Sequence, residues 1–442
     1  MASIPLLRLH HPKSTFAQQH GNVLTTEKFL TDVQSLAALL PERSHLLNLC
    51  ADRYHFAVGF AAAMLRGQIS LLPPNLTPNL LNNLAHRYPH LYCLNDGKVV
   101  STALHTFDFP SLSAAHNPAA AIPDIPAQQV AAIVFTSGST GDPVPNQKTW
   151  DAVTQSATVE AIRLGIYGRN DLTILGTVPS QHMYGFESTV LMAMQAGVVM
   201  HADKPFFPAD ISATLQKIQG PSALITTPVH LRTLITEKAP LHGAELIVCA
   251  TAPLALELAI SAETLYGIPL LEIYGSTETG QLATRRTAAN DEWHTFDHVK
   301  LRQMDDITYA SGGHVAGELP LSDVIELRDS THFKLHGRTA DMINIGGKRT
   351  SLAHLNYHLN AIEGVRDGVF FMPDEIPTKQ VRLTAFVVAP GLDNQAIFNA
   401  LRQRIDAVFL PRPLYKVETL PRNSTGKLPQ EKLLELLVQM PK

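Results

Sequence analysis

The chain has 442 residues, of which 45% are hydrophobic and 17% are charged. This composition can bury large cores and excludes an intrinsically disordered protein, and the length predicts two or three domains. With 35 basic against 39 acidic residues, the net charge of −4 leaves no basic excess for binding a nucleic-acid backbone.

The N-terminal sequence predicts a folded protein without a targeting segment. Its first residues contain no apolar core long enough for a signal peptide, and no stretch approaches the ~20 apolar residues of a transmembrane helix. The apolar run at 57–65 stops at Arg66 and predicts a buried helix. Three widely spaced cysteines (Cys50, Cys93 and Cys249) indicate reduced thiols. We therefore expect a cytoplasmic protein with no membrane insertion.

Short apolar runs alternate with helical stretches through the middle of the chain. Helices are predicted at 150–164 and 228–237. Each apolar run predicts a buried strand that ends in a polar or glycine-containing loop: 131–138, 172–178, 222–227, 245–252 and 269–276. This alternation predicts an α/β fold with parallel strands, in which ligands bind beyond the carboxyl ends of the strands.

The character of the sequence changes near residue 338. A polar, glycine-containing bridge is followed by a second set of elements, with helices predicted at 352–362, 396–406 and 431–440 and strands at 368–372 and 383–389. This material suffices for a small α+β domain. We therefore predict a large N-terminal domain of packed α/β subdomains over residues 1–337, a hinge over 338–343, and a small mobile C-terminal α+β domain over 344–442.

The first motif with chemical meaning is FTSGSTGDP, at residues 135–143. A run of small residues follows directly on a predicted strand, so its glycines can turn the backbone while hydroxyl and N–H groups surround an anionic oxygen. It is not a Walker A loop, because the G-x-x-x-x-G-K-[ST] spacing is absent. The pattern indicates either a phosphate-binding loop or an ordinary flexible loop.

Three further motifs follow in chain order. In EIYGSTETG, at residues 272–280, the Tyr274 ring could stack on a base and Glu278 could hold Mg²⁺ through oxygen. Arg338 lies in GRTAD and Lys427 in LPRNSTGK. Taken alone, each has an ordinary alternative: a turn with a solvated glutamate, a surface ion pair, and a solvated lysine.

Together and in this order, the four motifs resemble those of the adenylate-forming enzymes: acyl- and aryl-CoA synthetases, luciferases and nonribosomal peptide adenylation domains. That family has a TSGSTGxP phosphate loop, a YGSTE nucleotide and Mg²⁺ motif, a GRxxDxIxxxGxR hinge motif and a PRxxxGK motif with a catalytic lysine. PSQHMYG, at residues 179–185, matches its P-x-x-H-x-x-G acid-pocket element. The resemblance runs from Val130 to Lys427.

The resemblance implies a two-step reaction. A small carboxylic acid reacts with ATP in the presence of Mg²⁺ to give an acyl-adenylate and pyrophosphate, and a thiol of CoA or of a carrier protein then takes the acyl group. Because a carboxylate and a triphosphate are both anions, the enzyme must stabilise the charge that builds up as they meet.

The resemblance also assigns roles by position. The phosphates would be held by the first motif, through Thr136, Ser137, Gly138, Ser139, Thr140 and Gly141. The rest of the nucleotide would meet Thr251, Ala252, Tyr274 and Gly275, with Asp323 and Arg338 on the ribose. Glu278 would bind Mg²⁺. The catalytic residues would be Lys427, Glu278, Thr277 and His182, with Thr277 on the α-phosphate and Lys427 bridging the acid and that phosphate.

The same resemblance places the acid and the thiol. The acid pocket would be lined by His182, Met183, Tyr184 and Phe186, and the thiol tunnel would pass Gly346 and Gly347. An apolar, aromatic wall suits an aryl or medium-length acyl group. The chain looks similar to stand-alone ligases that load aryl or hydroxy-acyl acids onto carrier proteins, so a carrier protein is the favoured acceptor and CoA the alternative.

Some positions depart from the family pattern. Val144 stands where the phosphate loop usually has lysine, and Lys148 is the nearest substitute. Leu321-Ser322 replaces the Thr-Gly that usually precedes Asp323, and Ala340 replaces the first aspartate of the hinge pair. These departures leave open a nucleotide-binding pseudoenzyme. An amino-acid-activating enzyme is a second alternative, although Glu187 is out of register to hold an ammonium group.

Overall fold

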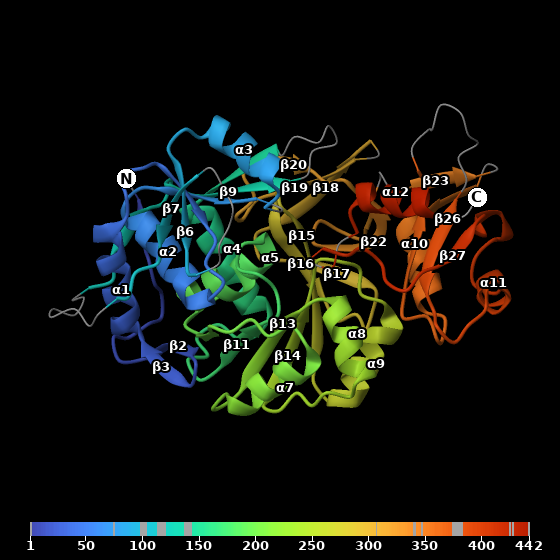
Figure 1. Cartoon of the computed structure of the whole chain (residues 1–442), viewed down its shortest axis with the longest axis horizontal. Coiled ribbons are helices and arrows are strands. Elements are labelled where there is room, and N and C mark those ends of the chain that lie inside the picture. The colour runs from blue at the N-terminus through green and yellow to red at the C-terminus, as the bar shows by residue number, and fades with distance from the viewer. Residues whose placement is uncertain are drawn as a thin grey trace.

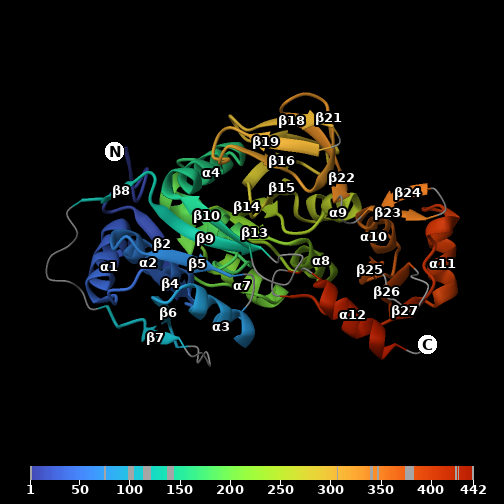
Figure 2. The same ribbon diagram turned by 90° about the horizontal axis from the view of Figure 1, so that it is seen from above.

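The computed structural model describes residues 2–73, 76–97, 104–112, 121–136, 144–305, 307–338, 342–345, 348–373, 383–423, 426 and 428–440. It contains two large sheets with helices on their faces, followed by a smaller sheet near the C-terminus. The elements of the C-terminal part form one end of the molecule in both views (Figure 1, Figure 2). The expected α/β class is confirmed, whereas the hinge residues 339–341 lie outside the described residues.

The first sheet has the order β10-β9-β5-β4-β6-β7 and is parallel except for β10. Its strands are β4 (His45–Asn48), β5 (Ile69–Leu72), β6 (Leu91–Asn95), β7 (His105–Asp108), β9 (Val130–Thr136) and β10 (Val144–Thr149). The helices α1 (Thr26–Leu39) and α2 (Arg53–Leu65) share a core with one face, and α3 (Pro78–Arg87) packs on the other. Side chains alternate along a strand, so Leu46 faces the first core and Leu47 the second.

The second sheet has the order β21-β22-β17-β16-β15-β14-β13-β11-β12-β2-β3. Its central strands are parallel: β2 (Thr15–Gln19), β12 (Val199–His201), β11 (Thr173–Gly176), β13 (Ser222–Thr226), β14 (Ala244–Cys249) and β15 (Leu270–Ser276). Antiparallel strands complete both sides: β3 (Asn22–Thr25), β16 (Gly280–Arg285), β17 (Glu292–Thr295), β21 (Asp323–Leu327) and β22 (His332–Arg338). Four of the five strands expected between residues 131 and 276 are therefore confirmed in this sheet, and the fifth is β9 of the first sheet.

Helices cover both faces of the second sheet. One face carries α7 (Pro208–Lys217), α8 (Pro228–Thr236) and α9 (Leu256–Tyr266). The other carries α4 (Trp150–Arg163), α5 (Met183–Gly185), the π-helix η1 (Phe186–Leu191) and α6 (Met192–Ala196). The helices expected at 150–164 and 228–237 are α4 and α8.

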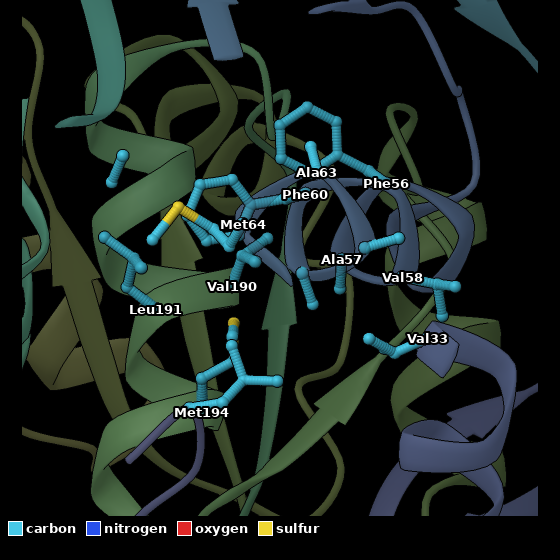
Figure 3. Close-up of a cluster of buried hydrophobic side chains, with 14 of the residues drawn as sticks. Val33, Phe56, Ala57, Val58, Phe60, Ala63, Met64, Val190, Leu191 and Met194 are labelled. Atoms are coloured by element: carbon cyan, nitrogen blue, oxygen red, sulfur yellow. The ribbon is translucent and has the colours of Figure 1, made fainter. Parts of the chain in front are cut away.

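The two large sheets meet through a shared layer of helices. Figure 3 shows side chains of α2, including Phe60 and Met64, beside Val190 and Leu191 of η1. The ring of Phe60 lies 4.9 Å from that of Phe186 in an edge-to-face arrangement. A helix that is apolar on every side is typical of a fully buried position, and α2 confirms the expected buried helix.

The C-terminal part has its own core. Its elements are β23 (Met342–Ile345), β24 (Lys348–Ser351), α10 (Leu352–Asn360), β25 (Asp367–Phe371), β26 (Thr384–Val388), α11 (Asn394–Arg402), η3 (Ala407–Phe409), β27 (Leu414–Lys416) and α12 (Gln430–Gln439). The helices α10 and α11 pack on one face of the β25-β26-β27 sheet and α12 on the other. The helices and strands expected here are confirmed, and the domain boundary at residue 338 stays a prediction.

Short strands complete the chain. The strands β18 (Lys300–Met304), β19 (Ile307–Ser311) and β20 (Glu318–Pro320) form a separate small sheet, and β1 (Ser3–Pro5) pairs with β8 (Asp124–Pro126). Cys50, Cys93 and Cys249 are buried free thiols. Within the ranges that the structure describes, no helix is long and apolar enough to cross a lipid bilayer.

Candidate active site

The carboxyl ends of β13, β14 and β15 lie next to one another at one edge of the second sheet, because these strands are adjacent and parallel. Thr251 and Ala252 follow β14, and the segment from Ser276 to Gly280 follows β15. Thr251 has a φ of 81°, a left-handed conformation that is unfavourable for a β-branched residue. Such strain is concentrated at functional sites, which supports a ligand site at this edge.

The turn from Ser276 to Gly280 is tight and presents Glu278 to solvent. A side chain at Gly275 would lie 2.4 Å from the carbonyl oxygen of Gly280, so only glycine allows this close approach of the two strands. The hydroxyls of Ser276 and Thr279 are 3.0 Å apart and close the turn. Thr277 is half-buried and Glu278 is exposed. The carboxylate of Glu278 is therefore held on a defined backbone while it stays open to a ligand.

Lys148 connects this turn with the first sheet. It lies on β10, is 8% exposed, and its Nζ donates a hydrogen bond of 2.6 Å to the carbonyl oxygen of Glu278. The strands β9 and β10 pair antiparallel, with Thr136 opposite Val144. They fix the two ends of the FTSGSTGDP loop, whose Ser137, Gly138, Ser139, Thr140 and Gly141 lie outside the described residues. The strand that follows the first motif thus contacts the turn of the second motif.

Three residues expected at the nucleotide lie close together on strands of the second sheet: Tyr274, Asp323 and Arg338. The Tyr274 hydroxyl donates to Oδ2 of Asp323 at 2.7 Å, and the Tyr274 ring packs against Trp293 and Phe333, each 5.6 Å away. Asp323 on β21 and Arg338 on β22 are direct cross-strand partners. The two residues expected at the ribose therefore occupy opposite positions of one strand pair, beside the tyrosine of the second motif.

A buried polar cluster underlies the turn. Glu187 on η1 accepts a hydrogen bond of 2.8 Å from Ser156, and a side chain at Gly280 would lie 3.3 Å from its Oε1. Glu160 on α4 is fully buried, and the amide nitrogen of Gln281, in the orientation that satisfies both of its ends, lies 3.1 Å from each Glu160 carboxyl oxygen. Burial raises the pKa of Glu187 to about 7 and that of Glu160 well above its usual value.

Glu160 was not among the residues expected from the sequence, although its position on the apolar face of a predicted helix indicates a buried carboxyl group. Val153, Ala157 and Ala161 form the buried face of α4, and Glu160 lies on that face at helical spacing. A charged residue in such a stripe needs a partner or a proton, and here Gln281 supplies the contact. Glu187, considered as an ammonium-binding residue, is instead directed into this cluster.

Glu160→Gln should flatten the dependence of stability on pH. The folded-state pKa is raised, so the folded protein keeps a proton that the unfolded chain has lost, and stability falls as pH rises from about 4.5 through the folded pKa. One such group changes the free energy of unfolding by about 1.4 kcal/mol per pH unit in that window. Urea denaturation from pH 5 to 8 should therefore show a steeper loss for the wild type than for Glu160→Gln. Parallel curves would contradict the prediction.

The PSQHMYG element lies at the same edge of the sheet. A side chain at Gly185 would lie 2.1 Å from the carbonyl oxygen of Pro179, so this turn also requires glycine. His182 and Met183 are half-buried, and the Tyr184 hydroxyl donates to the carbonyl oxygen of Val248 at the end of β14, 3.1 Å away. The Tyr184 side chain therefore reaches the end of β14, the strand that leads to Thr251 and Ala252 at the expected pocket.

Phe186 does not join this pocket. It is fully buried, and its ring packs edge-to-face on Phe56 and Phe60 of α2. The first turn of η1 directs the side chain of Phe186 into the core between the sheets, whereas Met183 precedes the turn. The structure therefore places Phe186 in the hydrophobic core, and we do not include it in the proposed acid site.

The loop that leads to Lys427 reaches the N-terminal part. Arg422 donates to both carboxylate oxygens of Asp367 at 2.7 Å and to the carbonyl oxygen of Gly426 at 2.6 Å. A side chain at Gly426 would lie 3.2 Å from Val229, at the start of α8. Because α8 follows β13, this contact lies at the carboxyl edge of the second sheet. Lys427, Gly346 and Gly347 themselves lie outside the described residues.

The sequence is similar to those of known enzymes. Residues 41–305 match the family described as AMP-binding enzyme. The chain is 30% identical to the 4-coumarate–CoA ligase of Halorhodospira halophila over 68% of this chain and 76% of that protein. It is 22% identical to the 2-succinylbenzoate–CoA ligase of a Staphylococcus epidermidis strain over 69% of this chain and 70% of that protein.

The fold has close counterparts among solved structures. The structure of the O-succinylbenzoate coenzyme A synthetase of Bacillus subtilis in complex with AMP matches 98% of this chain and 98% of its own, with a TM-score of 0.82 and 17% identity. At that identity the likeness shows the fold, and the family follows from the sequence matches. This chain therefore belongs to the family of AMP-binding enzymes, within the superfamily of adenylate-forming enzymes.

Proposed function

We propose that the protein is an ATP-dependent ligase that activates an aromatic carboxylic acid as its acyl-adenylate and then forms a thioester with CoA. The observation that carries the proposal is the convergence, at one edge of the second sheet, of the Glu278 turn, the Tyr274–Asp323 pair and the PSQHMYG element. In the first step a carboxylate oxygen of the acid attacks the α-phosphorus of ATP, and the bond to the bridging oxygen breaks as pyrophosphate leaves. In the second step the CoA thiolate attacks the acyl carbon and AMP leaves.

The residues present fit this chemistry. Asp323 offers carboxylate oxygens to ribose hydroxyls, with Arg338 opposite it on the neighbouring strand. Glu278 is an exposed carboxylate on a tight turn. Mg²⁺ is usually held by one or two protein carboxylates together with substrate phosphates, so Glu278 suits it. Bound Mg²⁺ would neutralise charge on the phosphates as pyrophosphate leaves.

The relatives favour an aromatic acid and CoA. The two relatives described above are named as CoA ligases of aromatic acids. We assign Tyr184 and Met183 of α5 to the acid site, because Tyr184 contacts Val248 on the strand that leads to Thr251 and Ala252. These side chains carry no formal charge, which favours an aromatic ring over a charged acid. Of the two acceptors expected from the sequence, CoA therefore replaces a carrier protein as our first choice. We propose a cytoplasmic location, which the three buried free thiols support.

The test is the release of pyrophosphate that depends on the acid. A panel of cinnamic and benzoic acids, fatty acids and amino acids would be assayed with ATP and Mg²⁺, each alone, with CoA, and with a pantetheinylated carrier protein. We expect an aromatic acid to give the fastest release and CoA to raise turnover. Faster turnover with the carrier protein would reassign the acceptor. ATP binding without release for any acid would contradict the proposal and favour a nucleotide-binding pseudoenzyme.

A further inference from the structure

We propose that Lys148 is a positioning residue for adenylation: it fixes the backbone of Glu278, and so the direction of the Glu278 carboxylate. The inference rests on the proposed function and adds to it a residue outside the four motifs. Lys148 lies on β10, and its ammonium reaches across to the turn that follows β15.

The contact links two structural units that would bind different parts of the nucleotide. The FTSGSTGDP loop is flanked by β9 and β10, and Lys148 pairs with Ala132 within this hairpin. The Glu278 turn belongs to the second sheet. A hydrogen bond of 2.6 Å from a largely buried ammonium joins them. Charged donors make the stronger hydrogen bonds, and this one constrains the turn from the side of the phosphate loop.

Burial and nearby carboxylates act on Lys148 in opposite directions. Burial lowers the pKa of Lys148, and the carboxylates of Glu187 and Glu278 oppose that effect. Glu187 is itself fixed by Ser156 and lies under Gly280, the last residue of the same turn. The buried ring of His314 lies close to Gly280, and burial lowers its pKa to about 4, so it adds no second positive charge beside Lys148.

The same geometry distinguishes Lys148 from a lysine in the phosphate loop itself. Val144, at the position where the resemblance predicts that lysine, is 51% exposed on β10. Lys148 lies further along the strand, and its Nζ is within hydrogen-bonding distance of a backbone carbonyl of the second sheet. Lys148 therefore affects phosphate binding indirectly, by holding the Glu278 turn in position.

The experiment uses Lys148→Met, which keeps most of the side-chain volume and removes the donor, and Lys148→Arg, which keeps a charged donor. Lys217→Met, at an exposed position on α7, is the matched control. The first readout is ATP affinity by calorimetry with and without Mg²⁺. The second compares pyrophosphate release with thioester formation from a preformed acyl-adenylate. The thermal midpoint of each variant shows whether it is folded.

Mg²⁺ should increase the affinity of the wild type for ATP. We expect Lys148→Met to reduce this increase about 10- to 100-fold and to slow pyrophosphate release by a similar factor. Thioester formation from the acyl-adenylate should change less than about threefold, since that step needs no metal-bound triphosphate. Lys148→Arg should recover part of the loss, and Lys217→Met should match the wild type. If Glu187 acts through Lys148, Glu187→Gln should have a smaller effect in the Lys148→Met background than in the wild type.

Two outcomes would overturn the inference. One is a folded Lys148→Met protein with an unchanged Mg²⁺-dependent ATP affinity. The other is an equal loss in both half-reactions, which a general structural defect would cause. If the wild type releases no pyrophosphate with any acid, the proposed function fails. The calorimetric comparison still tests Lys148 in that case, because it needs only ATP and Mg²⁺.

Discussion

Lys427→Ala should lower the rate of acyl-adenylate formation by about 100-fold or more, while thioester formation from a preformed acyl-adenylate stays within about threefold of the wild type. The carboxylate of the acid and the α-phosphate are both negatively charged, and their repulsion opposes the attack. An ammonium between them removes that repulsion only while they react, so it lowers the barrier of the first step.

The position of the loop supports this expectation. Arg422 ties the carbonyl of Gly426, the residue before Lys427, to Asp367 on β25, so the C-terminal core holds the loop. Gly426 in turn lies against Val229 at the carboxyl edge of the second sheet. Arg422 belongs to the PRxxxGK motif, yet its partner Asp367 lies 55 residues earlier in the chain, so the sequence alone could not have revealed the pairing.

The control is Lys432→Ala on α12. Lys432 is exposed and pairs with Glu435 at 2.7 Å, within the same helix. Exposed ion pairs of this kind contribute about 0–1 kcal/mol, so this variant should keep both half-reactions. The two half-reactions would be followed separately, by pyrophosphate release and by thioester formation from synthetic acyl-adenylate. Equal losses in both for Lys427→Ala would show that the lysine does not act on the first step alone.

The sequence predicted those parts of the fold that depend on local patterns. Each buried strand of the second sheet is a short apolar run, so β11, β13, β14 and β15 could be located from residue order alone. The strands β2 and β3 could not be located in this way. They precede the first sheet in the chain but join the far edge of the second, and β2 pairs with β12. No local pattern specifies a partner so distant in sequence.

The candidate site, like the fold, could be predicted from the sequence only where local patterns specify it. The loops were found because their residue types and spacing are distinctive, and the structure joins β10, the strand after the first motif, to the turn of the second motif through Lys148. The interactions that support the loops are contacts between distant segments, such as Gln281 with Glu160 and Tyr274 with Asp323. Phe186 shows the converse error. Its neighbours in sequence suggested a pocket residue, but the helical turn directs its ring into the core.

The largest effect on stability should come from Arg53→Met, which we expect to lower the free energy of unfolding by about 4 kcal/mol. Arg53 is the first residue of α2 and is 1% exposed. Its Nη1 donates to the carbonyl oxygens of His201 and Asp203, and its Nη2 to those of Gly176 and Val178, at 2.9–3.0 Å. Methionine would leave four carbonyls without this partner, three of them in buried hydrogen bonds and that of Asp203 in a partly buried one. Each unsatisfied buried acceptor costs about 1–3 kcal/mol before relaxation.

The measurement is urea denaturation followed by tryptophan fluorescence. The chain has two tryptophans, Trp150 and Trp293, and both are buried in the N-terminal part, so the signal reports on the region that contains Arg53. Arg53→Lys should lose less stability than Arg53→Met, because an ammonium has three donors but cannot match the planar fork of the guanidinium. Arg87→Met, at an exposed position on α3, should stay within about 0.5 kcal/mol of the wild type. An unchanged midpoint for Arg53→Met would contradict the prediction.

Arg53 also connects stability with the proposed site. Its four acceptors lie at and beyond the carboxyl ends of β11 and β12, and Val178 immediately precedes the PSQHMYG element. A side chain at Gly176 would lie 2.8 Å from Nη2 of Arg53, so the strand itself is shaped to admit the guanidinium. Arg53 on α2, which packs on the first sheet, therefore fixes the segment of the second sheet that leads to His182 and Tyr184. We expect Arg53→Lys to raise the KM for the acid as well as to lower stability, because the helix that anchors the two sheets also holds the entry to the proposed acid pocket.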